Sequence, residues 1–368
     1  MEEIIYVLKI IIYFILVFFL YFLTLKSSKI DFNEKKRVKL IIVILFCILF
    51  GFYSLICGQY PYSSDRGNFA FRFEKDMYLS YVKSESYGLF LLEKLLHLIS
   101  HDPKILFFSV AFIYLFLTLL SYDRVKDKEP FALLIIGLSA YFSYGFYMLK
   151  QCIAIGFIAL SFAEYSKKKI KQSIVCIFFA ILFHESAWII IPVYLAMSLN
   201  KNNFFKIMSY ILLICCALFF SKINIIIINI FSTIVPSLSS QMSIYLDNNG
   251  SLQENLNTMT ILKGLPFYFI LLFGLLNRKQ LKYKIEMYDK YMFLTFFVSI
   301  ATILSMFMYW MFRFATYCYF PVFIFSSLIL RELENEKDRS LFSVSLILIL
   351  FILTLRMWYQ YYFWYGGI

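Results

Sequence analysis

Apolar segments, mostly 15 to 22 residues long, recur along the whole chain and are separated by short loops rich in lysine and arginine. This length suits a helix that crosses a bilayer, and the segments lack the polar/apolar alternation of outer-membrane strands. The 368-residue chain is 61% hydrophobic and 21% aromatic, with a mean hydropathy of +0.75. The core of a water-soluble protein of this size could not hide so much apolar surface. The sequence therefore predicts an all-α, polytopic integral membrane protein.

Reading the apolar runs in order predicts about twelve transmembrane helices. They lie near residues 4–25, 40–57, 104–121, 131–148, 150–165, 172–184, 186–199, 207–221, 262–276, 291–311, 314–330 and 341–357. Three longer runs each contain a polar break: 131–165 at Lys150-Gln151, 172–199 at His184-Glu185 and 291–330 at Arg313. Each run could instead form one tilted helix, but dividing all three places every basic loop on one side of the membrane. We expect one membrane-embedded domain over residues 1–368.

Basic residues are concentrated in short loops between the predicted spans. Six loops hold 23 of the 35 lysine and arginine residues: 26–39, 122–130, 166–171, 200–206, 277–290 and 331–340. Because basic loops are retained in the cytoplasm, both termini are predicted to face outward from a multi-pass protein of the cytoplasmic membrane. The first run has no basic residue before it and no small-residue cleavage site after it, so we expect it to be retained. The net charge of +12 is mostly a signal of this topology, and nucleic acid is not a predicted partner.

Two segments on the predicted outer side are longer than simple turns, residues 58–103 and 236–260. The first contains Gly88–Ile99, which has apolar residues on most faces and in which Glu93 clusters with a lysine and a histidine. This pattern is typical of a helix that lies on the membrane interface or re-enters between spans. The second segment is polar and rich in serine and asparagine, which suits a lid. We therefore expect any chemistry to take place on the outer side of the membrane-embedded body.

Arg313 is the most informative charged residue, because at least seven uncharged residues flank it on each side. A cation in an apolar run costs roughly 2.5–3.5 kcal/mol on insertion scales unless it faces water or an anion. Its guanidinium could hold phosphate oxygens through two hydrogen bonds, and the structural alternative is an ion pair. Lys150 opens a predicted span at the outer face. Its ammonium could hold phosphate as a point charge, or could simply extend toward the interface.

Two further charged sequences lie at comparable junctions. His184-Glu185 falls between two predicted helices, where a histidine beside a carboxylate can act as a base or a hydrogen-bond donor. The structural alternative is a histidine that caps the turn. Asp65-Arg66, followed by Arg72 and Glu74, gives mixed charge in a loop dense in aromatics. This composition suits sugar rings or a phosphate, and equally a solvated loop with local ion pairs.

Four short motifs occur in order between roughly residues 50 and 330. They are Tyr62–Arg66 (YSSDR) followed by Glu85–Leu92 (ESYGLFLL), Leu149–Gln151 (LKQ) followed by Ile153-Ala154, Leu182–Ala187 (LFHESA) leading to Pro192, and Arg313–Tyr317 (RFATY) before Pro321. On a polytopic chain of this length, they resemble the EpsG family of the Wzy-type polysaccharide polymerases. The chain departs from the family pattern at Lys150, where arginine is usual, so the charge is kept without the bidentate geometry. Glu185 is also unusual after the histidine.

The resemblance implies a GT-C-like helical glycosyltransferase that polymerises undecaprenyl-pyrophosphate-linked oligosaccharide repeat units into exopolysaccharide, capsule or O-antigen at the outer membrane face. The diphosphate is a good leaving group, so the enzyme need only stabilise its developing charge and position or deprotonate the acceptor hydroxyl. Direct attack by the acceptor would invert the anomeric centre. The candidates for binding pyrophosphate or glycan are Arg313, Lys150, Arg66, Arg72, Gln151 and Tyr317. The candidates for the acceptor base are Asp65, His184 and Glu85.

The sequence predicts no cofactor, because it has no glycine-rich phosphate loop. His97 and His101 lack a convincing third ligand, so we expect no metal and metal-independent transfer. The lipid bilayer and the lipid-linked oligosaccharide are the predicted partners, and the sequence leaves a chain-length regulator open. Two other functions also stay open. A membrane O-acyltransferase would use His184-Glu185 and leave the outer cations idle, whereas a transporter of lipid-linked sugars would use the charges for binding only.

Overall fold

The computed structural model describes residues 2–27, 35–57, 65–75, 86–199, 257–305 and 309–365. Every secondary-structure element in these ranges is a helix, which confirms the all-α prediction for this part of the chain. Glu85, the predicted span 207–221 and most of the predicted outward segment 236–260 lie outside the described residues.

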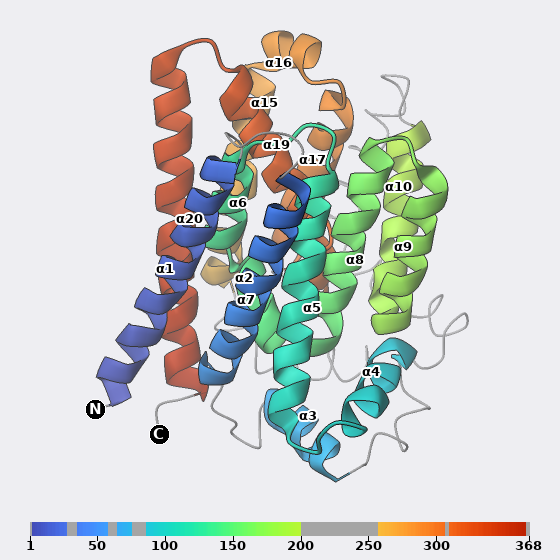
Figure 1. Cartoon of the computed structure of the whole chain (residues 1–368). Helices are drawn as coiled ribbons and strands as arrows, with labels where there is room; N and C mark the ends of the chain where they lie inside the picture. Colours follow the sequence, from blue (N-terminus) through green and yellow to red (C-terminus); the bar gives the residue numbers. More distant parts are fainter. Residues whose placement is uncertain are drawn as a thin grey trace.

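Long helices stand side by side in one bundle, in which α5 packs between α2 and α8 (Figure 1). The helices are α1 (Glu2–Ser27), α2 (Lys35–Cys57), α3 (Asp65–Glu74), α4 (Tyr87–His97), α5 (Pro103–Arg124), α6 (Pro130–Leu138), α7 (Ala140–Tyr147), α8 (Leu149–Ser166), α9 (Ile170–Phe183), the short 3-10 helix η2 (Glu185–Ile189), α10 (Ile190–Leu199), α15 (Asn257–Leu276), α16 (Arg278–Lys284), α17 (Tyr288–Leu304), α18 (Tyr309–Thr316), α19 (Tyr319–Glu332) and α20 (Glu336–Tyr365). α6, α8 and α19 are buried along most of their length, so they form the core.

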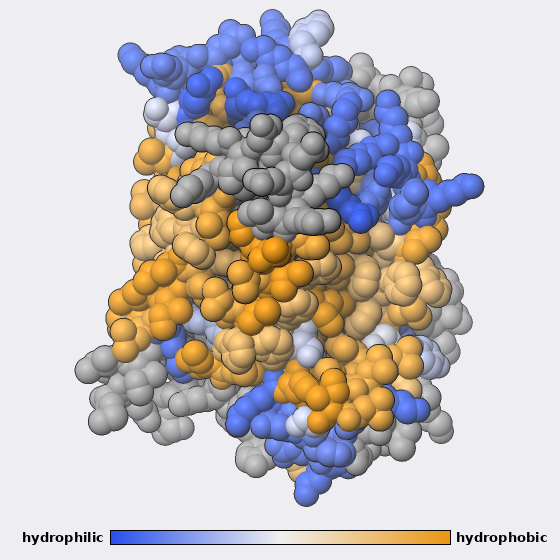
Figure 2. Space-filling view, in the orientation of Figure 1, coloured by the Kyte–Doolittle hydropathy of each residue, from blue (hydrophilic) through white to orange (hydrophobic). Residues whose placement is uncertain are grey.

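Apolar side chains form a band around the middle of the molecule, between two hydrophilic ends (Figure 2). Phe22 of α1, Phe178 of α9 and Val344 of α20 are each more than half exposed. An apolar surface of this extent is unfavourable in water and suits contact with lipid. The band therefore agrees with the membrane placement that the composition predicts.

Three described helices are long and apolar enough to cross a bilayer: Val7–Leu25, Pro103–Arg124 and Glu336–Trp358. Four shorter apolar helices lie at Leu40–Ile56, Ile170–Phe183, Glu185–Ser198 and Leu262–Leu276. The sequence predicted about twelve spans, more than the described helices establish. The difference arises because several interior helices, such as α6, α7 and α18, are short. Helices enclosed by protein can be interrupted, since neighbouring helices rather than lipid satisfy their backbone groups.

Two of the three predicted breaks are confirmed. α8 begins at Leu149, so Lys150 and Gln151 lie in its first turn. His184 separates α9 from η2 and caps η2, because its side chain accepts a hydrogen bond from the backbone N–H of Ser186.

The prediction of a break at Arg313 is wrong. Arg313 lies within α18, and helices end instead at Leu304 and at Thr316. A break that the sequence analysis did not predict divides the span 131–148 at Ser139. The hydroxyl of Ser139 accepts a hydrogen bond from the backbone N–H of Tyr141, which caps α7. At Ser139 and at His184, the polar side chain accepts a hydrogen bond from a backbone N–H that the break leaves free.

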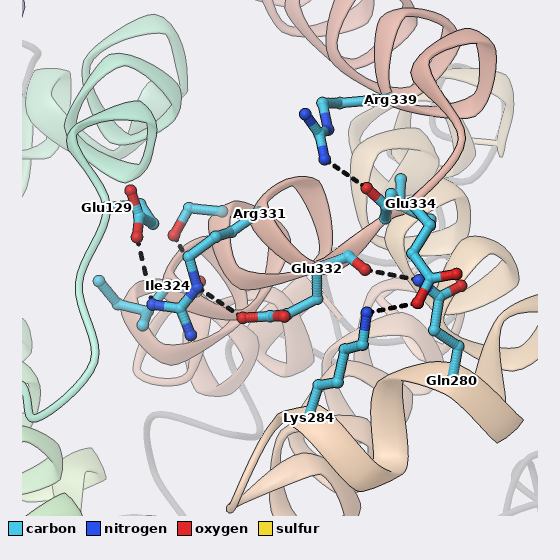
Figure 3. A network of polar contacts seen from close by, with 10 residues as sticks. Glu129, Gln280, Lys284, Ile324, Arg331, Glu332, Glu334 and Arg339 are labelled. Carbon is cyan, nitrogen blue, oxygen red and sulfur yellow. Dashed lines mark hydrogen bonds and ion pairs between the residues drawn. The ribbon is translucent and has the colours of Figure 1, made fainter.

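The described basic loops meet at one end of the bundle, named the basic end below, as the sequence predicted. Arg331 contacts Glu129 at 3.2 Å and Glu332 at 2.6 Å, and Lys284 contacts Glu334 at 2.6 Å (Figure 3). Two further ion pairs lie at the same end. Arg124–Glu164 joins the end of α5 to the end of α8, and Lys168–Glu286 joins the loop after α8 to the loop between α16 and α17. Exposed pairs contribute little stability individually, but they show that the protein's own acids balance much of the positive charge at this end.

Candidate functional site

The predicted site residues that the structure describes lie at the end opposite the basic end, named the site end below. α8 begins there and α9 ends there. α3 and α4 lie at the same end, where α1 begins and α20 ends (Figure 1). Exposed apolar side chains on and just after α4, among them Leu91, Leu95 and Leu98, agree with the predicted interfacial helix.

Gln151 holds α18 against the start of α8. Its side-chain amide donates hydrogen bonds to the backbone oxygen of Arg313, at 2.9 Å, and to Oγ1 of Thr316, at 3.1 Å. Thr316 Oγ1 in turn donates to the same Arg313 oxygen at 2.7 Å. Gln151 is 4% exposed, so its amide is committed to this contact. We therefore treat Gln151 as a residue that positions Arg313 rather than one that contacts substrate.

Arg313 and Lys150 lie around one histidine, although 163 positions separate them in the sequence. The positive charges of both side chains act on the His184 ring, and that of Arg313 also acts on Tyr317. α8 has no side-chain cap at its N-terminus, so the partial positive charge of its first turn adds to that of Lys150. Two cations and a helix N-terminus at one place favour a phosphate.

His184 is held in one orientation by a short chain of hydrogen bonds. Its Nδ1 accepts from the backbone N–H of Ser186 at 3.2 Å and lies 2.7 Å from Oγ of Ser186. The same Oγ lies 2.9 Å from the hydroxyl of Tyr317, which is 1% exposed. A backbone N–H can only donate, so Nδ1 carries no proton and the neutral ring has its proton on Nε2. His184 is therefore arranged as a hydrogen-bond donor, and its role as an acceptor base loses support.

Phe69 of α3 lies between two cations of the site. The guanidinium of Arg72 is 5.0 Å from the centre of its ring, and the ammonium of Lys150 is 5.7 Å from it. Both distances are in the range of cation–π attraction. Both positive charges therefore lie against the same aromatic ring.

Glu93 of α4 is an acidic residue of the site that was not among the sequence candidates. The charges of Arg72 and Lys150 both act on it. Its side chain is 2% exposed, and within the described part of the chain its Oε1 has no hydrogen-bond partner. Burial raises the pKa of Glu93 to about 7, although the positive charges of Arg72 and Lys150 oppose the shift. Such a carboxyl can take up and release a proton near neutral pH, as an acid–base catalyst must.

The sequence itself carries a signal for Glu93. The buried residues of α4 are Gly88, Leu89, Glu93 and Leu96, which share one helical face. A carboxylate on the face that otherwise packs into the protein is unusual, because burial without compensation is costly. The position of Glu93 on this face therefore marks it as a candidate beside Asp65, His184 and Glu85.

Gly88 sets how closely α4 packs against the end of α9. A Cβ at this position would lie 2.8 Å from the ring of Phe183 and 3.0 Å from the backbone oxygen of Leu182. We expect Gly88→Ala to push α4 outward, destabilise the fold by about 1–3 kcal/mol and reduce activity through displacement of Glu93. Thermal unfolding and a polymerisation assay test this, with Leu91→Ala on the exposed face of α4 as the control. Equal behaviour of the two variants would contradict it.

Arg66 belongs to the framework of the site. Its guanidinium is buried and donates to the backbone oxygens of Phe146, at 2.9 Å, and of Ser54, at 2.7 Å. It also lies 4.1 Å from the centre of the Phe107 ring. These contacts tie α3 to α7, α2 and α5, so the guanidinium of Arg66 holds helices together rather than binding phosphate.

The remaining sequence candidates are less informative. Asp65 is the first residue of α3, and Glu85 lies outside the described residues, so their roles as bases stay predictions. His97 and His101 face each other with their Nδ1 atoms 2.9 Å apart, and His97 also contacts the ring of Phe73. In the part of the chain that the structure describes, no three His, Cys, Asp or Glu side chains gather as metal ligands would.

Comparison with known proteins identifies the family. No curated protein and no solved structure matches the chain significantly. The family model described as the EpsG family matches residues 70–366, which include Arg72, Glu93, Lys150, His184 and Arg313. The match covers most of the chain and nearly all of the site described above, and it agrees with the resemblance carried by the four short motifs. The chain belongs to the EpsG family.

Proposed function

We propose that this membrane protein polymerises oligosaccharide repeat units carried on undecaprenyl pyrophosphate, at the outer face of the cytoplasmic membrane. Membership of the EpsG family points to a polymerase associated with exopolysaccharide. The proposal includes about twelve transmembrane helices in a GT-C-like architecture, with both termini outside. The observation that carries it is the convergence of Lys150 and Arg313 on His184, beside the buried carboxyl of Glu93.

The donor diphosphate is placed at the start of α8. Lys150, the first-turn backbone of α8 and the guanidinium of Arg313 stabilise the charge that develops as the bond between the anomeric carbon and the phosphate oxygen breaks. His184 donates its Nε2 proton in a hydrogen bond to a phosphate oxygen. The electron pair of the broken bond leaves with the diphosphate, so no further acid is required.

Glu93 is the proposed acceptor base, in preference to Asp65, His184 and Glu85. Its carboxylate accepts the proton of the acceptor hydroxyl as that oxygen attacks the anomeric carbon from the side opposite the diphosphate. The products are a glycosidic bond of inverted configuration, a free lipid diphosphate and a protonated Glu93. Arg72 and Lys150 keep enough of Glu93 ionised near pH 7 for this step. The scheme needs no metal and no cofactor.

The test uses full-length protein in liposomes with a defined lipid-linked repeat unit. A ladder of products differing by one repeat unit, with release of lipid diphosphate, would support the proposal. A membrane O-acyltransferase would leave the chain length unchanged, and a transporter would move the labelled lipid between leaflets without altering it. Either result would overturn polymerisation. The fixed Nδ1 acceptor of His184 also leaves an acyltransferase without its histidine base.

Lys150→Arg tests the phosphate contact at the start of α8. We expect polymerisation at the wild-type rate or a few-fold above it, because arginine keeps the charge, stacks on Phe69 and adds bidentate geometry. Lys150→Met should lower the rate roughly tenfold or more, through loss of a charge-assisted contact. The measurement is the initial rate of repeat addition, with Lys337→Met at the basic end as control. A fully active Lys150→Met variant would remove Lys150 from the mechanism.

A further inference from the structure

The hydrogen bonds that end at His184 have a direction, which follows from the hydrogens available. Nδ1 of His184 accepts from the backbone N–H of Ser186, so it carries no proton. The contact of 2.7 Å between this Nδ1 and Oγ of Ser186 therefore requires the hydroxyl to donate. A serine hydroxyl has one hydrogen, so at the next contact, which is 2.9 Å long, the hydroxyl of Tyr317 donates to Oγ. Both hydroxyls thus donate toward the histidine ring.

The hydroxyl of Tyr317 is enclosed by the protein. Tyr317 is 1% exposed, whereas His184 and Ser186 are only half-buried. Tyr317 was a sequence candidate for binding pyrophosphate or glycan. Because its one hydroxyl hydrogen is donated to Ser186, it has none left for a phosphate oxygen. Any effect of this hydroxyl on a bound diphosphate must therefore pass through Ser186 and His184.

A chain of this direction makes His184 a better hydrogen-bond donor. The hydrogen bonds accepted at Nδ1 fix the proton of the neutral ring on Nε2. They also draw electron density toward Nδ1, and successive hydrogen bonds polarise one another. The N–H at Nε2 consequently becomes a stronger donor toward an anion, and the ring cannot turn without losing its contacts with Ser186.

The residues around Tyr317 also hold the other groups of the site. Gln151 donates to the backbone oxygen of Arg313 and to Oγ1 of Thr316, and it follows Lys150 directly in the sequence. Tyr317, the next residue after Thr316, contacts Ser186 at the start of η2. Residues 313–317 therefore join the first turn of α8 to the start of η2, so that one short segment relates Lys150, Arg313 and His184 in space.

We propose that Ser186 and Tyr317 are positioning residues, which orient His184 and strengthen its Nε2–H as a hydrogen-bond donor to the departing diphosphate. The inference rests on the proposed function, in which His184 contacts a phosphate oxygen. Neither hydroxyl touches the diphosphate, and both act through the ring of His184. Tyr317 acts only through Ser186, because its hydroxyl hydrogen is donated to Oγ of that residue.

The first experiment observes the ring nitrogens of His184 without substrate. Full-length protein labelled with ¹⁵N-histidine is studied by NMR in nanodiscs, and the signals of His184 are those that His184→Gln removes. We expect Nδ1 to carry no proton in the wild type. Tyr317→Phe should shift the Nδ1 resonance, Ser186→Ala should shift it further, and the combined variant should match Ser186→Ala.

Two exposed residues provide matched controls for this measurement. Ser198→Ala and Tyr283→Phe each remove one exposed hydroxyl and should leave the His184 resonances unmoved. Unmoved resonances in Tyr317→Phe and Ser186→Ala would overturn the proposal, whether or not the protein polymerises.

The second experiment measures the initial rate of repeat addition in liposomes, normalised to inserted protein. Tyr317→Phe should slow it roughly three- to tenfold and Ser186→Ala roughly tenfold, whereas Ser186→Thr keeps a hydroxyl and should retain most of the rate. The combined Ser186→Ala and Tyr317→Phe variant should be no slower than Ser186→Ala alone. Losses that multiply would show that Tyr317 acts independently of Ser186 and would overturn the proposal. A wild type that forms no product, with the NMR shifts as expected, would overturn the proposed function and leave the positioning of His184 supported.

Discussion

Polymerisation by Arg313→Ala is expected to fall below detection, a loss of roughly 10²–10³-fold or more, with the protein still inserted in the membrane. The guanidinium is placed where charge develops on the departing diphosphate, and groups in that position give large effects on rate. The fold should survive, because the helix is held through the backbone oxygen of Arg313, which Gln151 and Thr316 contact whatever the side chain. The measurement is the product ladder from the liposome assay, normalised to inserted protein.

Arg313→Lys separates charge from geometry. We expect a loss of roughly 10- to 100-fold, since an ammonium keeps the charge but cannot bind two phosphate oxygens in a planar fork. Arg278→Ala, an exposed arginine at the basic end, is the matched control and should polymerise normally. Wild-type chain lengths from a stably inserted Arg313→Ala variant would exclude Arg313 from the mechanism.

Glu93→Gln should be the second most damaging substitution, with a loss of roughly 10²–10⁴-fold in rate, the usual contribution of a general base. Glutamine keeps the size and polarity of the side chain and removes only its ability to accept a proton. The wild-type rate should fall about tenfold for each pH unit below the pKa of about 7 and level off above it. The measurement is the pH profile of the initial rate, and a profile that is flat between pH 5.5 and 8.5 would contradict the assignment.

Arg72→Gln tests the same carboxyl from a neighbouring position. Removing a positive charge that favours the ionised form should raise the pKa of Glu93, so the rising limb of the profile should move to higher pH. A variant with reduced activity and an unmoved profile would show that Arg72 acts elsewhere. Glu74→Gln, an exposed neighbour in α3, is the control.

Stability should respond in the opposite sense to activity. The pKa of Glu93 is raised in the folded protein, so its contribution to the free energy of unfolding is most favourable at low pH and is lost as the pH rises toward about 7. Above that pH the fold contains a buried carboxylate. Glu93→Gln should therefore unfold at an equal or higher temperature than the wild type at pH 8, while being inactive. Marked destabilisation at pH 8 would instead indicate a structural role for Glu93.

The sequence was sufficient for everything that depends on local pattern. The length of the apolar runs predicted helices and a membrane, and the described basic loops do meet at one end. The breaks at Lys150 and His184 were also predictable, because each is marked by a polar residue within an apolar run. Lys150 lies in the first turn of α8, and His184 lies between α9 and η2. The break predicted at Arg313 was wrong, because Arg313 lies within α18, where Gln151, a distant residue, contacts its backbone oxygen.

Only the tertiary structure decided what each charged residue does. Arg66 and Arg313 were both candidates to bind phosphate, yet the structure shows the guanidinium of Arg66 donating to two backbone oxygens from other helices, and Gln151 contacting the backbone oxygen of Arg313. His184 became a donor because of the N–H of Ser186, and Glu93 gained a pKa near neutrality from its burial beside Arg72 and Lys150. The physical reason is common to these cases. The energy of a charge in a membrane protein depends on the groups within a few ångströms of it, and folding brings those groups from distant parts of the chain.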